Sequence, residues 1–167
     1  MGQDVYIPAS NWLIASSLMI ALILNFMPLQ GDWLTLRPDF VVLAIMYWSV
    51  NHPHKLGMSV AFGLGLMMDV GNAGILGQHA LAYCVVICFT LVFGRRLRLF
   101  NWLQQAPQIG LICFIMQLSM VLIALSSGAQ APEWSYFLST VTVTLFWIPV
   151  SFVLTLLQKQ KPNPDVL

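Results

Sequence analysis

Residues 56–81 read LGMSVAFGLGLMMDVGNAGILGQHAL, and this stretch raises the first question about the fold. It holds a 12-residue uncharged apolar run from Gly57 to Met68, followed by Asp69 and a glycine-rich turn. An acidic side chain inside a lipid bilayer is costly unless it is paired or reaches an interface. The stretch therefore predicts a membrane helix whose last turn carries a carboxylate that needs partners.

The composition extends this interpretation to the whole chain. Hydrophobic residues make up 59% of the 167 positions and charged residues 8%, whereas a soluble domain has about 25% charged residues. The apolar runs recur from one end to the other, so we expect residues 1–167 to form a single integral membrane domain. The N-terminus lacks a basic region and a cleavage site, so we expect no cleaved signal peptide. The net charge of +1 gives no indication of nucleic-acid binding.

Six apolar runs predict an all-α polytopic membrane protein with six transmembrane helices. The second run, Phe40 to Val50, has only 11 residues. Such a helix could span only with its flanking turns or by thinning the bilayer locally. The expected helices cover residues 12–29, 38–51, 56–70, 79–94, 106–126 and 136–158.

The basic residues predict the orientation. With six spans, six of the seven basic residues fall on one side of the membrane, and Arg37 falls on the other. Because cytoplasmic loops are enriched in lysine and arginine, both termini are expected in the cytoplasm, with Asp69 near the outer end of its helix. The six are Lys55, Arg95, Arg96, Arg98, Lys159 and Lys161. We interpret the arginine cluster as a topology signal and a contact with lipid.

Asp69 has three possible roles: a structural or assembly contact, an interfacial residue that caps the outer turn, or a general base. A base needs a second titratable group or a nucleophile beside it, which the outer half of the chain hardly offers. A structural or assembly role is therefore preferred. Arg37, in a connector that also carries Asp39, is the expected counter-charge.

Small residues give the third predicted helix a face for close packing. Gly57, Gly63 and Gly65 lie on this helix, with Ser59 and Ala61 between them. In lipid, small residues let another helix approach closely. The face could pack inside the bundle or against a partner's helix, and both alternatives stay open.

Residues typical of metal sites do not form a set. His52 and His54 flank a proline, but a zinc site needs three or four protein ligands, so we expect a hydrated cytoplasmic turn. His79 is expected to be an interfacial residue. We find no HExxH, nucleophile elbow or phosphate-binding glycine loop. We therefore expect no metal, no cofactor and no enzymatic activity. The cysteines, interpreted as buried structural thiols, are Cys84, Cys88 and Cys113.

Several motifs occur together in a specific order. Arg37-Pro38-Asp39 precedes the second helix, which ends at Tyr47-Trp48; Gly65 lies four residues before Asp69; and Leu76-Gly77 is followed by Leu81. With the chain length and the six apolar runs, this pattern resembles the MreD family, small integral membrane proteins of bacterial rod-shape morphogenesis. The resemblance covers nearly the whole chain.

The resemblance implies a non-enzymatic scaffold in the bacterial inner membrane. Its main partner would be MreC, within a complex that includes MreB, RodA and the elongation-specific transpeptidase, and it would help to organise lateral peptidoglycan synthesis and cell shape. It also implies a fold similar to the substrate-binding subunits of energy-coupling-factor transporters, although fold analogy does not carry substrate binding with it. The alternative is a small-molecule-binding membrane subunit of a transporter. Candidate structural or partner contacts are Arg37, Asp39, Asp69, Gly57, Gly65 and Gly77.

Overall fold

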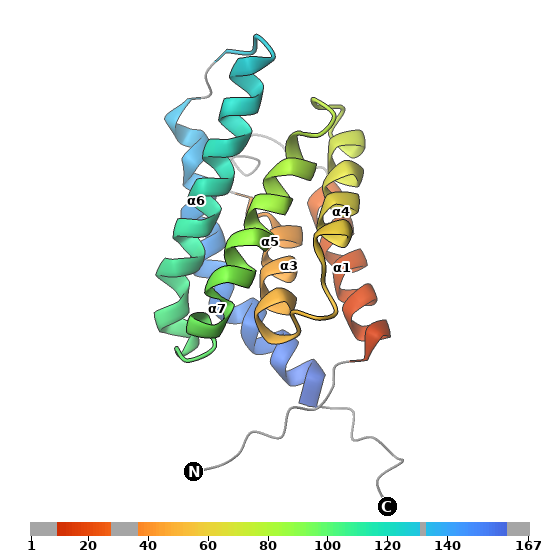
Figure 1. The fold of residues 1–167 in the computed structure, drawn as a ribbon, viewed down its shortest axis with the longest axis vertical. Helices are drawn as coiled ribbons and strands as arrows, with labels where there is room; N and C mark the ends of the chain where they lie inside the picture. The colour runs from red at the N-terminus through yellow and green to blue at the C-terminus, as the bar shows by residue number, and fades with distance from the viewer. Residues whose placement is uncertain (1–9, 28–36, 131–132, 160–167) are drawn as a thin grey trace, which may run out of the picture.

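The computed structural model describes residues 10–27, 37–130 and 133–159, which form a bundle of helices (Figure 1). These residues contain six α-helices, one short 3-10 helix and no β-strand, so the all-α prediction is confirmed. The elements are α1 (Asn11–Phe26), α3 (Phe40–Asn51), α4 (Met58–Gly71), α5 (Gln78–Leu97), α6 (Trp102–Ser126), η1 (Trp134–Phe137) and α7 (Leu138–Lys159).

Helix α3 lies at the centre of the bundle. Every residue from Val41 to Val50 is buried, and α3 packs against α1, α5 and α7. A helix that is apolar on all sides is expected to be buried on all sides. Its 12 residues give a length of about 18 Å, less than the roughly 30 Å of a bilayer core. The second apolar run is therefore short because other helices, rather than lipid, surround it.

The longest helices carry the exposed apolar surface. In the described part of the chain, three helices are long and apolar enough to cross a membrane, namely α5, α6 and the segment Trp134–Gln158 that contains η1 and most of α7. Leu111, Leu122 and Leu145 are among their exposed side chains. Helices α1, α3 and α4 are shorter apolar helices, so the number of six spans stays a prediction.

The junction between α5 and α6 differs from the expected boundaries. Helix α5 continues through Arg95 and Arg96, and α6 begins at Trp102 rather than near residue 106. Basic side chains are favourable in the last turn of a helix because they lie near the negative end of its dipole. The buried Gln105 amide donates to the carbonyl oxygens of Leu97 and Phe100, both at 2.9 Å, and so fixes the connection.

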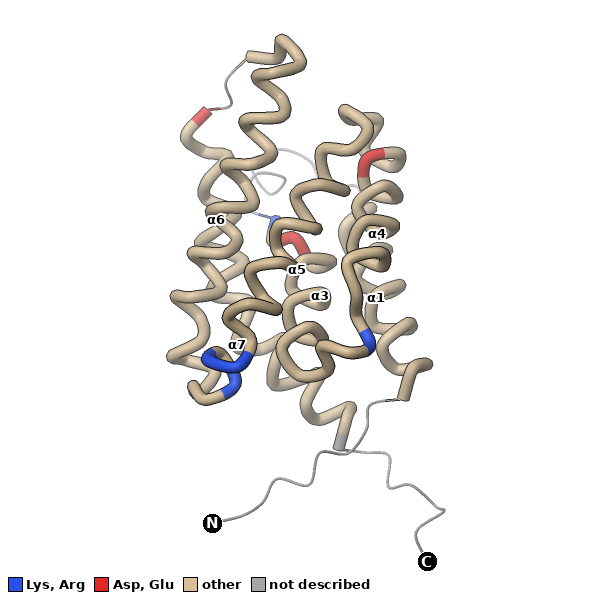
Figure 2. Tube along the Cα trace, viewed as in Figure 1, with Lys and Arg blue, Asp and Glu red and all other residues tan. Residues whose placement is uncertain are grey.

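The two ends of the bundle differ in charge. Figure 2 shows most of the basic segments where α5 ends and α4 begins, and the acidic segments, with a further basic segment beside one of them, farther along the bundle. The first of these ends, with Arg95, Arg96 and Arg98, is called the arginine end. The opposite end, with Asp69 and the first turn of α5, is called the cavity end. Helix α1 begins and α7 ends at the arginine end (Figure 1).

Candidate functional site

Asp69 is buried at the cavity end, against the first turn of α5. The carboxylate is completely inaccessible to solvent. It accepts hydrogen bonds from the backbone N–H groups of Gly77 and His79, both at 2.8 Å, and of Ala80 at 3.4 Å. The first N–H groups of a helix have no intrahelical partner and carry a partial positive charge. Helix α5 therefore supplies the partners that the sequence required for this carboxylate.

The side-chain partner of Asp69 is His79, whose Nδ1 lies 2.8 Å from Oδ1 of the carboxylate. Arg37 instead donates to the carbonyl oxygen of Met27 at 3.0 Å. The expected Arg37–Asp69 ion pair is therefore wrong. The physical reason is that the α5 terminus and His79 already surround both carboxylate oxygens, so a distant guanidinium is not needed.

Two glycines make the contact between Asp69 and α5 possible. Gly77 has a φ angle of +95°, a left-handed conformation that favours glycine, and its N–H points at Asp69. A Cβ on Gly65 would lie 2.7 Å from the carbonyl carbon of His79 and would overlap the backbone of Ala80. Gly65 thus serves packing of α4 against α5. Gly63, by contrast, has no atom within 4 Å of a built Cβ, and Gly57 lies at the start of α4.

Asp39, which is partly buried, forms a second polar contact between helices and joins α1, α3 and α5. Its carboxylate caps α3 by accepting from the Val42 N–H at 3.1 Å. It also accepts from the Asn25 amide and from the Tyr83 hydroxyl, both at 2.7 Å. The Asn25 amide oxygen in turn accepts from the Phe40 N–H at 3.0 Å. Asp39 is therefore committed to holding three helices together.

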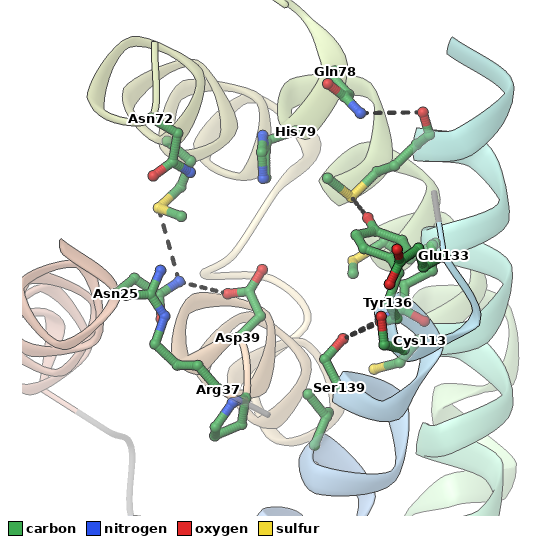
Figure 3. Close-up of a pocket in the computed structure, with 17 residues that line it drawn as sticks. Asn25, Arg37, Asp39, Asn72, Gln78, His79, Cys113, Glu133, Tyr136 and Ser139 are labelled. Carbon is green, nitrogen blue, oxygen red and sulfur yellow. Dashed lines mark hydrogen bonds between the residues drawn. The ribbon is translucent and has the colours of Figure 1, made fainter. Parts of the chain in front are cut away.

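A cavity of about 570 Å³ lies between Asp39 and His79, which both line it. Figure 3 shows Asn25, Arg37 and Asp39 on one side of it and His79 and Gln78 on another. The lining carries both signs of charge and many amide and hydroxyl groups, so the cavity suits a polar segment or molecule that makes several hydrogen bonds. Further lining residues are Pro38, Met68, Asn72, Cys113, Met116, Gln117, Met120, Glu133, Ser135, Tyr136, Ser139 and Val143.

Sequence reasoning missed three residues of this region. Asn25 and Gln117 interrupt apolar runs, and Tyr83 lies within another. The amide nitrogen of Gln117 donates a hydrogen bond to the Ser139 hydroxyl, and its amide oxygen accepts one from the Thr140 hydroxyl of α7. A lone amide in an apolar membrane helix is costly unless it is satisfied. That cost was the available signal for both amides, whereas nothing in the sequence marks Tyr83.

The arginine end has exposed basic side chains. Arg95, Arg96 and Arg98 are all exposed, and the Arg98 Nε donates to the carbonyl oxygen of Gly94 at 3.3 Å. Among the residues that the structure describes, the ion pair is His79–Asp69, so none of their carboxylates neutralises these arginines.

The histidine turn near this end is less hydrated than expected. His52 is half-buried, its Nε2 lies 2.7 Å from the Gln158 amide nitrogen, and its ring packs on Trp48. Burial and the nearby Lys55 ammonium lower the pKa of His52 below its ordinary value. His54 is exposed, as a hydrated turn requires.

The three thiols lie in different environments. Cys113 is buried, Cys84 is partly buried and Cys88 is exposed, so the interpretation as buried thiols is wrong for Cys88. All three are free. No group of three side chains able to hold a metal occurs within residues 10–27, 37–130 and 133–159.

Comparisons with known proteins decide the family. The family model for rod shape-determining protein MreD matches residues 8–159. The chain belongs to the MreD family. It is 30% identical over 137 residues to a rod shape-determining protein MreD of Haemophilus influenzae (strain ATCC 51907 / DSM 11121 / KW20 / Rd), an alignment that covers 80% of this chain and 83% of the relative. No solved structure gives a significant match.

Membership in the MreD family supports a role in the determination of rod shape. With its apolar helices, it also supports a place in the inner membrane. The MreD family is a structural, shape-determining family rather than a known class of enzymes. The similarity to energy-coupling-factor transporter subunits stays a prediction.

Proposed function

We propose that this MreD family member is a non-enzymatic membrane scaffold that binds MreC and helps to organise lateral peptidoglycan synthesis. MreB, RodA and the elongation-specific transpeptidase would be further members of the complex. The observation that supports the proposal is the polar cavity at the cavity end. Asp39 and Asp69, beside this cavity, form hydrogen bonds that hold helices together, rather than a catalytic group.

An aromatic cluster next to the cavity supplies a surface for a partner helix. Phe137 packs against Phe114, Trp134 and Tyr136, with ring centroids 5.5, 6.3 and 5.7 Å away. Trp134 is 90% exposed, and Tyr136 also lines the cavity. Exposed aromatic side chains are typical anchors of protein interfaces. The partner's transmembrane helix would pack on this cluster, and the segment that follows it would enter the cavity.

The same proposal places six spans across the membrane, with the arginine end in the cytoplasm and the cavity end outside. Single cysteines test the orientation in a cysteine-free background. Ala129→Cys, at the cavity end, should react with a membrane-impermeant maleimide added outside the inner membrane, whereas Leu99→Cys, at the arginine end, should not. Labelling of Leu99→Cys alone would contradict the orientation.

Co-purification tests partner binding. Trp134→Ala and Arg37→Gln should each reduce the amount of MreC recovered with the solubilised protein, by about tenfold for the aromatic anchor. Trp12→Ala is the matched control, since Trp12 is 77% exposed but lies at the arginine end. Equal recovery of MreC with all three variants would contradict docking at the cavity end.

The cavity volume favours one second function, binding of a small molecule. Its 570 Å³ falls within the range of roughly 300–1,000 Å³ that is usual for ligand pockets. Native mass spectrometry of the purified protein separates the two functions. A retained small molecule, with no MreC recovered, would favour the transporter-like subunit over the scaffold.

A further inference from the structure

A second hollow lies between α5 and α6 and shares no lining residue with the cavity. It is a groove of about 350 Å³ near the arginine end. Its walls are mainly apolar and come from the second half of α5 and the first half of α6, with Phe89 and Phe93 on one side and Leu111 and Ile115 on the other. The rings of Phe89 and Phe93 are stacked nearly parallel, with centroids 6.3 Å apart, and form a flat wall.

The position of the groove determines what can fill it. Helices α5 and α6 are both long and apolar enough to cross a membrane. An apolar groove between two such helices faces hydrocarbon rather than water. The apolar walls of the groove match an acyl chain.

The mouth of the groove carries positive charge. Arg96 itself lines the groove, and Arg95 and Arg98 lie beside it on the same turn. None of the described carboxylates pairs with them. An arginine guanidinium matches a phosphate group geometrically, because it can donate two parallel hydrogen bonds. A zwitterionic lipid would also bring a cationic group toward three arginines, which is unfavourable.

The surroundings of the mouth match a membrane interface. Leu99 is 85% exposed, and Leu103 and Trp102 are exposed in the same connection between α5 and α6. Tryptophan and arginine are enriched where helices cross the level of the lipid headgroups. This places the guanidinium of Arg96 at headgroup level, with the apolar groove running into the hydrocarbon.

We propose that the groove between α5 and α6 is a binding site for one anionic phospholipid, with an acyl chain against Phe89, Phe93 and Leu111 and the headgroup phosphate on Arg96. This site is independent of the scaffold function, since the groove and the cavity share no lining residue. It would fix the position of the arginine end in the anionic leaflet.

Native mass spectrometry tests the headgroup contact. The detergent-solubilised protein is titrated with phosphatidylglycerol or with phosphatidylcholine of the same acyl chains. One phosphatidylglycerol should remain bound, with about tenfold higher occupancy than phosphatidylcholine. Arg96→Gln should lower phosphatidylglycerol binding about tenfold. Equal binding of the two lipids would overturn the proposal.

Two further variants separate a built site from general surface attraction. Lys55→Gln removes the same charge at the same end of the bundle but lies outside the groove, so binding should be unchanged. If Lys55→Gln and Arg96→Gln weaken phosphatidylglycerol binding equally, general attraction of the lipid to basic side chains explains the binding, and the proposed site is refuted. Ile115→Trp fills the groove and leaves every arginine, so it should also lower binding about tenfold. Wild-type binding by this variant, shown to be folded by its thermal unfolding, would refute the acyl-chain position.

Discussion

At the cavity end, Asp69 is buried and Asp39 is partly buried, and together they accept hydrogen bonds from three different helices. At the arginine end, by contrast, Arg95, Arg96 and Arg98 are exposed and no described carboxylate pairs with them. A buried carboxylate needs partners from the protein itself, and these partners fix how the helices lie. An exposed guanidinium finds partners in water and lipid headgroups. Charge thus serves the internal structure at one end and external contacts at the other.

Replacement of Asp69 at the cavity end should cause the largest loss of stability. Asp69→Leu removes a fully buried carboxylate and leaves the partly buried N–H groups of Gly77 and His79 without their acceptor. We expect a loss of about 3–5 kcal/mol in the free energy of unfolding, the scale for removing one partner of a buried charged contact. Steric trapping in detergent measures this quantity. Glu133→Leu, at an exposed position near the same end, is the control and should change it little. Wild-type stability of Asp69→Leu would contradict the structural role of the carboxylate.

The close approach of α4 to α5 gives the next largest effect. Gly65→Ala places a Cβ against the backbone of Ala80, which cannot yield as a flexible side chain can. We expect a loss of about 1–3 kcal/mol, typical of overpacking. Gly63→Ala is the matched control on the same helix, because its Cβ meets nothing, and alanine favours helix by up to about 1 kcal/mol over glycine. The changes in unfolding free energy of the two variants, measured by steric trapping, should have opposite signs or clearly different sizes.

Two tyrosine variants allow a direct comparison of hydrogen bonding at the two ends of the bundle. Tyr83→Phe removes a hydrogen bond to the Asp39 carboxylate at the cavity end. Tyr47→Phe removes contacts with two neutral groups toward the arginine end, the Thr155 hydroxyl and the Gln158 amide oxygen. Hydrogen bonds to charged groups contribute about 1.5–3 kcal/mol and neutral ones about 1 kcal/mol. Because Tyr83 is fully buried and its partner is charged, Tyr83→Phe should cost more unfolding free energy than Tyr47→Phe. An equal loss for the two variants, or a larger loss for Tyr47→Phe, would show that the two ends of the bundle are not stabilised differently.

The smallest effect concerns pH at the arginine end. The pKa of His52 is lowered in the folded protein, first by burial and then by Lys55. The unfolded chain therefore binds more protons, so the stability that His52 contributes is fully present above its unfolded pKa and is lost as the pH falls through the folded pKa. His52→Gln should flatten the fall in thermal stability between about pH 7 and about pH 5. His54→Gln, at an exposed position, should keep the wild-type slope, and a wild-type slope for His52→Gln would contradict this account.

The helices were predictable, but their arrangement was less so. Apolar runs fix where helices form because lipid and a protein interior both demand satisfied backbone groups. Composition cannot separate these two environments, so the residue types in the run Phe40 to Val50 gave no sign that α3 is the central helix. Its short length was the only indication.

The sequence indicated some residues of the candidate site but not their pairings. Asp69, Asp39 and Gly77 were expected to matter, and the structure brings Asp69 and Gly77 together. The partner of Asp69 was missed because backbone N–H groups at a helix start leave no mark in the sequence. Arg37 was preferred over His79 because formal charge is visible in a sequence, whereas the direction of a helix dipole is not.

Site-specific photo-crosslinking tests the central claim, that MreC docks at the cavity end, most directly. A photoreactive amino acid is placed at position 134 or at position 12, both exposed tryptophans at opposite ends of the bundle. We expect a crosslink to MreC from position 134 and none from position 12. A crosslink from position 12 alone would contradict docking at the cavity end.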